Sequence, residues 1–218
     1  MGFWEQSWNN IDSSRVEAYK EGFNFDSDGI IDFLKEKQCH KVLDAGCGCG
    51  IYALKLAKLG FEVDGFDVAG SASDIAMKLM SDNGFTGKFL TEDIKNTRLV
   101  AERYDAVISR DVIDHMTKAD AKLALKELLR LTKNDGYVIV TVDSLDDEYV
   151  SEPHIVDADG NYCFNAGKWN GMVFHPYDKK ELNDLVDDNT EHYLVDLDDG
   201  LMLVCRRNGD KNDFISHE

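Results

Sequence analysis

Residues Val42 to Gly50 read Val-Leu-Asp-Ala-Gly-Cys-Gly-Cys-Gly, and this stretch decides the fold. Its apolar start is typical of a short buried strand, and three glycines at alternate positions follow. Glycine tolerates positive φ angles and lets a ligand approach the backbone closely. A helix that begins there leaves unpaired N–H groups facing the ligand. We therefore predict a strand, a ligand-binding turn and a helix over residues 41–59.

Short apolar runs and helical patterns alternate on both sides of this stretch. Such alternation is typical of a parallel sheet that is covered by helices. The pattern predicts further strands at 61–67, 87–90, 104–109 and 137–142. It also predicts helices at 71–83 and 117–131.

The last two predicted strands, 191–196 and 201–206, flank Asp199-Gly200, a pair that is typical of a tight hairpin turn. One of them should therefore run antiparallel to the rest. We predict an α/β fold, namely a Rossmann-like three-layer sandwich. Its sheet should be seven-stranded and mostly parallel, with an antiparallel strand in the terminal hairpin.

Two segments lie outside this alternation. Residues 1–35 combine aromatic side chains with a polar background, which suggests a helical lid. Residues 144–177 follow a sheet strand and contain both prolines, and loops at such positions commonly determine substrate specificity. We expect a single domain over 1–207, with an N-terminal lid, a cap insertion at 144–177 and a mobile tail at 208–218.

The chain is strongly acidic, with 24 basic and 42 acidic residues and a formal net charge of −18. Nucleic acids are bound largely through cations that neutralise phosphates, so this balance disfavours them. A local basic groove remains an alternative, although no Lys/Arg-rich stretch indicates one. We expect a small-molecule acceptor, no nucleic acid, and a monomer or homodimer.

Five cysteines show no framework spacing, which indicates free thiols in a reducing compartment. No apolar run approaches the roughly 18–20 residues that span a bilayer, and the first residues lack the features of a secretory signal. Cys47 and Cys49 could bind a soft metal, but they more simply occupy variable positions of the glycine turn. We expect a cytoplasmic protein without a membrane contact and without a metal.

Two acids distinguish the glycine turn from a dinucleotide site. Asp44 precedes the first glycine, where a carboxylate would repel a pyrophosphate but attract an ammonium or sulfonium group. The glycines are spaced Gly-x-Gly-x-Gly, unlike the Gly-x-Gly-x-x-Gly dinucleotide pattern. Asp67 ends the next strand about 20 residues on, where a carboxylate can accept hydrogen bonds from ribose hydroxyls. The combination favours S-adenosyl-L-methionine over a nicotinamide or flavin cofactor.

At these residues the chain resembles the class I S-adenosylmethionine-dependent methyltransferase family, and the resemblance runs from about Lys41 to Arg206. It implies that Asp44 and the glycine turn hold the methionine part, that Asp67 binds the ribose, and that Val68 packs on adenine. The implied cofactor-binding residues are Asp44, Ala45, Gly46, Cys47, Gly48, Gly50, Asp67, Val68, Asp93, Ile94, Ser109 and Arg110.

Candidates for contact with the methyl acceptor follow the fourth strand. Asp111 could accept a proton or bind a cationic acceptor, and it could equally be a helix cap. His115 could be a general base, because histidine titrates near neutrality, or a core histidine bonded to the backbone. His175 could reach over the methyl group or only shape a turn. Trp4, Trp8, Tyr19 and Trp169 could wall the pocket or simply pack.

The sequence thus predicts a methyltransferase that acts on a small molecule by in-line displacement, for which positioning can supply much of the rate. Three alternatives stay open. The chain could bind adenosylmethionine without catalysis and serve a protein partner. It could methylate RNA, or it could be a nicotinamide oxidoreductase, which Asp44 and the glycine spacing disfavour.

Overall fold

The structure, a computed structural model, describes residues 2–11, 16 and 28–208. Tyr19 and residues 209–218 of the predicted tail lie outside the described residues. No helix in the described part of the chain is both long enough and apolar enough to cross a membrane.

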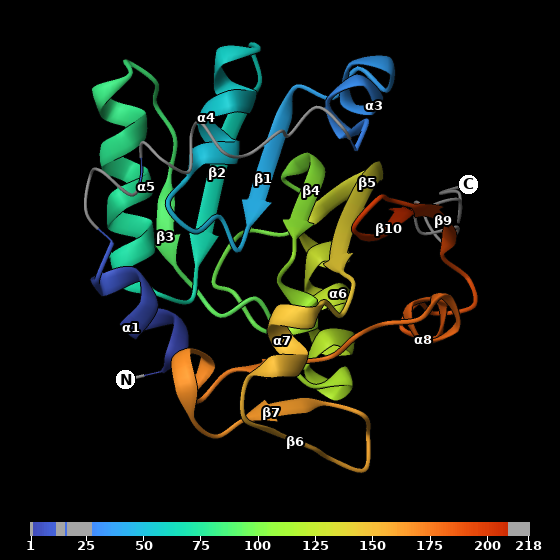
Figure 1. The fold of residues 1–218 in the computed structure, drawn as a ribbon. Helices are drawn as coiled ribbons and strands as arrows, with labels where there is room; N and C mark the ends of the chain where they lie inside the picture. The colour runs from blue at the N-terminus through green and yellow to red at the C-terminus, as the bar shows by residue number, and fades with distance from the viewer. Residues whose placement is uncertain (1, 12–15, 17–27, 209–218) are drawn as a thin grey trace.

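A seven-stranded sheet forms the centre of the molecule (Figure 1). Its strands lie in the order β3-β2-β1-β4-β5-β10-β9. The strands are β1 (Lys41–Ala45), β2 (Glu62–Asp67), β3 (Phe89–Thr91), β4 (Tyr104–Arg110), β5 (Thr132–Asp143), β9 (Glu191–Asp196) and β10 (Gly200–Arg206). The first five pair in parallel, so their carboxyl ends meet at one edge, where open α/β sheets bind ligands.

The terminal hairpin supplies the antiparallel strand. β10 pairs antiparallel with β5 on one side and with β9 on the other, with Leu203 opposite both Val140 and Leu194. The predicted Rossmann-like α/β fold with a mostly parallel seven-stranded sheet is therefore confirmed.

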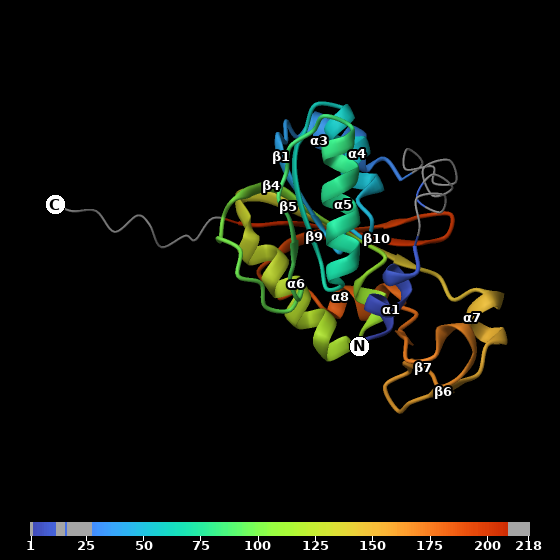
Figure 2. The same cartoon turned by 90° about the vertical axis from the view of Figure 1, so that its left-hand side faces the viewer.

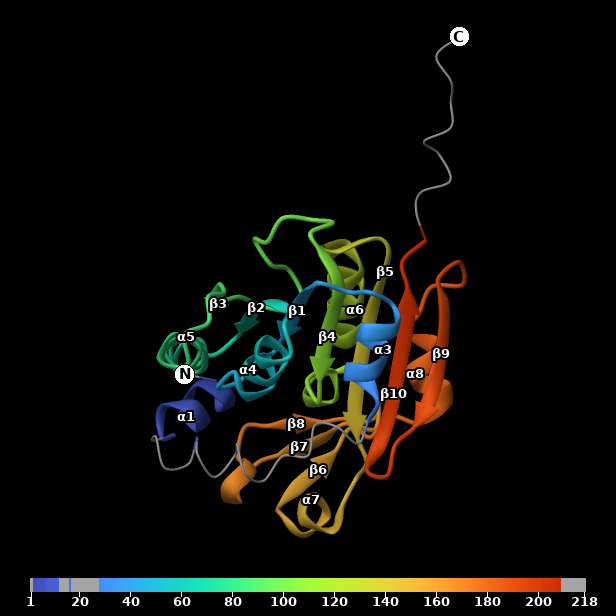
Figure 3. The same cartoon turned by 90° about the horizontal axis from the view of Figure 1, so that it is seen from above.

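Helices cover both faces of the sheet, as the side view and the view from above show (Figures 2 and 3). One face packs against α3 (Ile30–Glu36), α4 (Ile51–Lys58) and α5 (Gly70–Asp82). The other packs against α6 (Lys118–Leu131) and α8 (Lys179–Asp184). Alternation along each strand divides the side chains between the two cores: Val42 belongs to the first, and its neighbour Leu43 to the second. Both side chains are fully buried, as expected for a central strand.

β5 begins earlier than the predicted 137, because Thr132 already pairs with Tyr104. The register then shifts, and pairing resumes with Tyr137 opposite Ala106. A side chain at Gly136 would meet the carbonyl oxygen of Asp105 at 2.7 Å, so glycine permits this bulge. The hydrophobic pattern shows only the regular part of the strand after the bulge.

Residues 144–177 form a separate layer beyond the carboxyl edge of the sheet (Figure 1). Their elements are α7 (Asp147–Ser151), β6 (His154–Val156), β7 (Tyr162–Phe164), the 3-10 turn η2 (Gly167–Trp169) and β8 (Val173–Phe174). The three strands make a small antiparallel sheet. Phe164, Met172 and Phe174 form its buried core, and two aromatic residues of α1 (Phe3–Asn9), Phe3 and Trp4, pack against it.

Candidate functional site

The glycine turn joins β1 to α4, and its three glycines have left-handed backbone conformations. Gly46, Gly48 and Gly50 have φ angles of 83°, 49° and 79°, which L side chains rarely adopt. The turn is tied to β2, because the N–H groups of Gly46 and Cys47 both donate to the carbonyl oxygen of Phe66. A Cβ at Gly48 would lie 2.8 Å from the Trp8 ring, so the turn also depends on glycine for space.

Asp67 connects the end of β2 to this turn. Its Oδ2 accepts the N–H of Gly48 and its Oδ1 accepts that of Ala69, each at 2.9 Å. The side chain is buried, and burial raises the pKa of Asp67 against the opposing effect of these hydrogen bonds. Each carboxylate oxygen keeps a second lone pair, so Asp67 can still accept hydrogen bonds from two hydroxyl groups.

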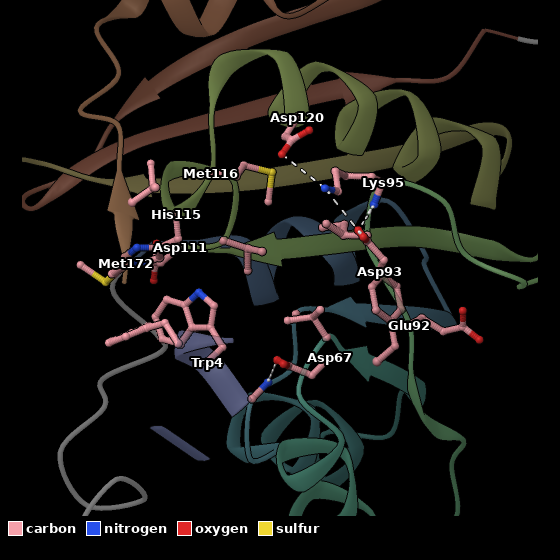
Figure 4. Close-up of a pocket in the computed structure, with 18 of the residues that line it drawn as sticks. Trp4, Asp67, Glu92, Asp93, Lys95, Asp111, His115, Met116, Asp120 and Met172 are labelled. Atoms are coloured by element: carbon pink, nitrogen blue, oxygen red, sulfur yellow. Dashed lines mark hydrogen bonds and ion pairs between the residues drawn. The ribbon is translucent and has the colours of Figure 1, made fainter. Parts of the chain in front are cut away.

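A cavity of about 550 Å³ opens beside these residues. Its lining comes from the glycine turn, the ends of β2 and β4, the loop after β3, helix α1 and the segment before β8 (Figure 4). Of the predicted cofactor residues, Gly46, Gly48, Asp67, Val68, Asp93, Ile94 and Arg110 line it. Residues from four separate strand ends are thus brought to one space.

One end of the cavity has the composition expected around an adenine ring. Val68 is 57% exposed and Ile94 is buried, and both line the space. Asp93 faces the same end, and the ammonium of Lys95 lies between it and Asp120, 3.8 Å from the first carboxylate and 3.3 Å from the second (Figure 4). Apolar walls with a few polar groups at the edge are typical of small-molecule sites.

The remaining predicted cofactor residues do not line the cavity. Ala45, Cys47 and Gly50 belong to the backbone that shapes the turn, and burial raises the pKa of the Cys47 thiol. Ser109 is fully buried, and its hydroxyl has no partner among the described residues. Asp44 is buried beneath the turn, so any effect of its charge would be exerted through the turn.

The Asp44 carboxylate is a buried polar group that is not fully satisfied. Its Oδ2 has no hydrogen-bond partner among the described residues. Burial raises the pKa of Asp44 to about 7, against the lowering effect of Arg110. A positive charge placed at the turn would favour the ionised carboxylate and lower this pKa.

At the other end, Arg110, Asp111 and His115 come from the end of β4 and the 3-10 turn η1 (Ile113–His115). Arg110 forms an ion pair with Asp28 and lies over the Tyr52 ring. The structure thus brings Asp111 and His115, two of the three predicted acceptor-contacting residues, to one part of the cavity wall (Figure 4).

His115 sits in an aromatic environment. Its ring centroid is 4.8 Å from that of Trp4, in an edge-on arrangement, and 5.7 Å from that of Phe174. Burial lowers the pKa of His115 to about 4, although an interaction with the Val173 backbone opposes this. The imidazole is therefore neutral at physiological pH, and its Nδ1 has no hydrogen-bond partner among the described residues.

His175 lies elsewhere and does not line the cavity. Its backbone N–H donates to the Asp114 carbonyl oxygen at 2.6 Å, and its Nε2 lies 3.4 Å from Glu181 at the start of α8. The side chain is only 2% exposed and packs on Tyr177. This geometry corresponds to the turn-shaping alternative for His175.

Several lining residues were not among the predicted site residues. Phe3 of α1 and the segment Gly171, Met172 and Val173 complete the wall, together with Trp4 and Trp8, which the sequence suggested as wall residues. A clustering of aromatic side chains was the only sequence signal for this wall. His154 packs on Tyr162 in the small sheet and is not a lining residue.

Comparisons with known proteins agree with this geometry. Residues 42–136 match the Methyltransferase domain family. The ubiquinone biosynthesis O-methyltransferase of Bartonella tribocorum is 28% identical over 46% of this chain and 40% of its own length. The tRNA (carboxymethyluridine(34)-5-O)-methyltransferase of Arabidopsis thaliana is 35% identical over 50% of this chain and 26% of its own. The chain thus spans less than half the length of these two relatives.

The fold is shared over nearly the whole chain. A S-adenosylmethionine-dependent methyltransferase from Clostridium acetobutylicum superposes with a TM-score of 0.67 and 15% identity, covering 88% of this chain and 95% of that one. The strand order, the glycine turn and the sequence match lead to the same assignment. Residues 42–136 thus carry the Methyltransferase domain, and the chain has the fold of the S-adenosylmethionine-dependent methyltransferases.

Proposed function

We propose that this protein transfers a methyl group from S-adenosyl-L-methionine to a small-molecule acceptor. The observation that carries the proposal is a continuous cavity that joins the glycine turn and Asp67 to an aromatic chamber at the end of β4. The methyl donor supplies an activated methyl group on a sulfonium, which an acceptor displaces in line. The protein's part is to bind, orient and shield the two molecules.

The residues fit this donor. Gly48 lines the cavity without a side chain, so the methionine part can approach the backbone beside the Trp8 ring, and the Asp67 carboxylate can accept the ribose hydroxyls. Val68 and Ile94 would enclose the adenine, with Asp93 at its edge. The half-satisfied Asp44 carboxylate beneath the turn suits a positively charged ligand better than a diphosphate.

The size of the cavity supports a small acceptor. Ligand sites usually measure about 300–1,000 Å³, and this one measures about 550 Å³. Adenosylmethionine is itself the size of one such ligand, so it would occupy most of the space. α1 and residues 171–173 wall the remainder, and we propose that they act as lid and cap.

At the acceptor, the neutral His115 imidazole lines the cavity with its ring, because its unpartnered Nδ1 is buried. Asp111, whose pKa is raised by burial, could receive a proton. Either residue would orient the acceptor toward the methyl group.

The relative that modifies tRNA supports a second candidate, an RNA acceptor. The net charge of −18 opposes RNA binding, and α1 and residues 171–173 take up part of the cavity wall. We therefore favour the metabolite.

Methyl-labelled adenosylmethionine tests the proposal. The purified protein is incubated with the labelled donor and, in parallel, with a metabolite extract and with total tRNA. We expect label in the small-molecule fraction and none in tRNA. Label in tRNA would support the second candidate, and donor binding without any transfer would indicate a non-catalytic protein.

A further inference from the structure

The acceptor chamber is the part of the cavity lined by Phe3, Trp4, Asp111, His115 and Met172. Figure 4 shows Asp111, His115 and Met172 at one end, with Trp4 below them and Asp93 and Lys95 at the other end. Three aromatic rings, a thioether and one carboxylate therefore surround the acceptor position. This composition carries information about the charge of the acceptor.

Both cations that line the cavity are already compensated. Lys95 lies at the adenine end, 3.3 Å from Asp120. Arg110 is paired with Asp28, which has a side-chain exposure of only 6%. Neither cation is available to neutralise Asp111 completely, and an anionic acceptor would find no uncompensated positive charge among the lining residues.

Further carboxylates lie behind Asp111. Asp114 is fully buried, and burial together with the charges of Asp111 and Asp143 raises the pKa of Asp114 well above its usual value. Burial and the charges of Asp111 and Asp199 raise the pKa of Asp143 to about 7. Raised pKa values of this kind mean that the surroundings of Asp111 disfavour additional negative charge, so a cation bound there would be stabilised and a carboxylate or phosphate would not.

Asp111 is held in position by its backbone and by Thr141. Its φ of 53° is a left-handed conformation that is uncommon outside glycine and is enriched at functional sites. The Thr141 hydroxyl donates to Oδ1 at 2.6 Å, and the Asp111 N–H donates to the Thr141 carbonyl oxygen at 3.1 Å. Oδ2 accepts no hydrogen bond from the described residues, so one carboxylate oxygen is available to a ligand.

We propose that the methyl acceptor is an amine that enters as an ammonium ion and binds between the Asp111 carboxylate and the Trp4 ring. A carboxylate combined with aromatic faces is the chemistry that recognises ammonium groups. This inference rests on the proposed methyl transfer and names its acceptor class. Asp111 is then the residue that selects an amine over an alcohol of the same shape.

The reaction balances with the groups present. The ammonium proton passes to the Asp111 carboxylate, and the positive charge of the nearby sulfonium favours this loss. The nitrogen lone pair then forms the N–C bond as the C–S bond breaks, and sulfur keeps the bonding electrons as a thioether. The methylated nitrogen carries the charge that sulfur loses, and Asp111 later releases its proton to water.

The acceptors of the curated relatives do not decide this point. The family match covers residues 42–136, which include Asp111 and His115. Trp4 and Met172 lie outside that range, in α1 and beside the small sheet. Three of the five chamber residues, Phe3 included, therefore come from segments that the match does not include.

A binding experiment with adenosylhomocysteine present tests the inference. Calorimetry first measures the affinity of the protein for adenosylhomocysteine. The complex is then titrated with primary amines of increasing size, such as ethylamine, phenethylamine and tryptamine, and with the alcohol of matching shape. We expect the best amine to bind at least tenfold more tightly than its alcohol.

Two variants and one control accompany the titration. Asp111→Asn keeps the shape and tolerates the left-handed backbone, and it should reduce amine affinity at least tenfold while leaving alcohol affinity unchanged. Asp135→Asn is the matched control, because Asp135 also has a positive φ, of 64°. It is exposed and does not line the cavity. It should change nothing. Trp4→Leu should weaken the amine at least threefold.

The outcomes separate the two proposals. Failure of adenosylhomocysteine to bind would overturn the proposed function. Normal binding of adenosylhomocysteine, with every amine no tighter than its alcohol, would overturn the amine inference alone. An amine preference that survives in Asp111→Asn, with the fold and adenosylhomocysteine binding intact, would also overturn it.

Discussion

The carboxylate of Glu5 accepts a hydrogen bond from the backbone N–H of Gly70, with 2.7 Å between Oε2 and the nitrogen. Gly70 is the first residue of α5, whose N-cap, Ala69, offers no side-chain cap. The charge of Glu5 therefore compensates the positive end of a 13-residue helix. It also fastens α1 across the cavity, where Trp4 meets His115 and Trp8 meets Gly48.

Loss of this fastening should loosen the proposed lid. Glu5→Ala removes a cap, which typically costs about 1 kcal/mol of unfolding free energy. We expect adenosylhomocysteine to dissociate several-fold faster, measured by stopped-flow fluorescence. Glu36→Ala, at an exposed position of α3, is the control and should leave the rate unchanged. An unaltered rate in Glu5→Ala would show that α1 does not limit ligand release.

A methyl group at Gly48 should block the site. Gly48→Ala adds a Cβ 2.8 Å from the Trp8 ring, on the surface that the methionine part must approach. Gly84→Ala is the matched control, since Gly84 has a φ of 77° but nothing within 4 Å of an added Cβ. Both variants should lose about 1 kcal/mol of stability from backbone strain. Only Gly48→Ala should lose adenosylhomocysteine binding by calorimetry. An equal loss of binding affinity in both variants would contradict the assignment of the glycine turn.

Because His115 is buried as a neutral ring, the free energy of unfolding should depend on pH. Because burial lowers the pKa of His115 to about 4, the unfolded chain takes up a proton below about pH 6.5 that the folded chain does not. This residue therefore stabilises the fold above pH 6.5, and its contribution is lost as the pH falls toward 4. The slope is at most about 1.4 kcal/mol per pH unit.

Urea unfolding of wild type and His115→Gln at pH 7, 6 and 5 measures this slope. The free energy of unfolding should fall more steeply for wild type than for the variant as the pH drops. Parallel curves would mean that His115 titrates alike in both states and is not buried as a neutral ring.

The sheet and the glycine turn were predictable because their signals are local. A strand can be predicted from the hydrophobic pattern of its own residues. The turn at Gly46 to Gly50 needs positive φ angles that glycine alone adopts readily. Asp67 followed from the same logic, because it ends the next parallel strand and must lie beside the turn. The side chains at parallel strand ends meet whatever the rest of the chain does.

The rest of the site depends on contacts between distant segments. Glu5 and Gly70 are 65 residues apart, and no local pattern marks them as partners. His175 and His115 looked alike in the sequence, yet the Asp114 carbonyl and Glu181 fix the former outside the cavity. Ser109 similarly sits at a strand end, but its side chain is fully buried. The sequence predicts that these residues lie near the ends of the strands, but it does not predict the direction in which their side chains point.

The central claim is that the glycine turn and Asp67 bind adenosylmethionine, and isothermal titration with adenosylhomocysteine tests it most directly. Wild type should bind one equivalent, and Asp67→Ala should bind at least tenfold more weakly, because hydrogen bonds to a charged group contribute about 1.5–3 kcal/mol. Asp74→Ala, at an exposed position of α5, should bind as wild type does. Wild type that does not bind, or Asp67→Ala that binds equally well, would contradict the claim.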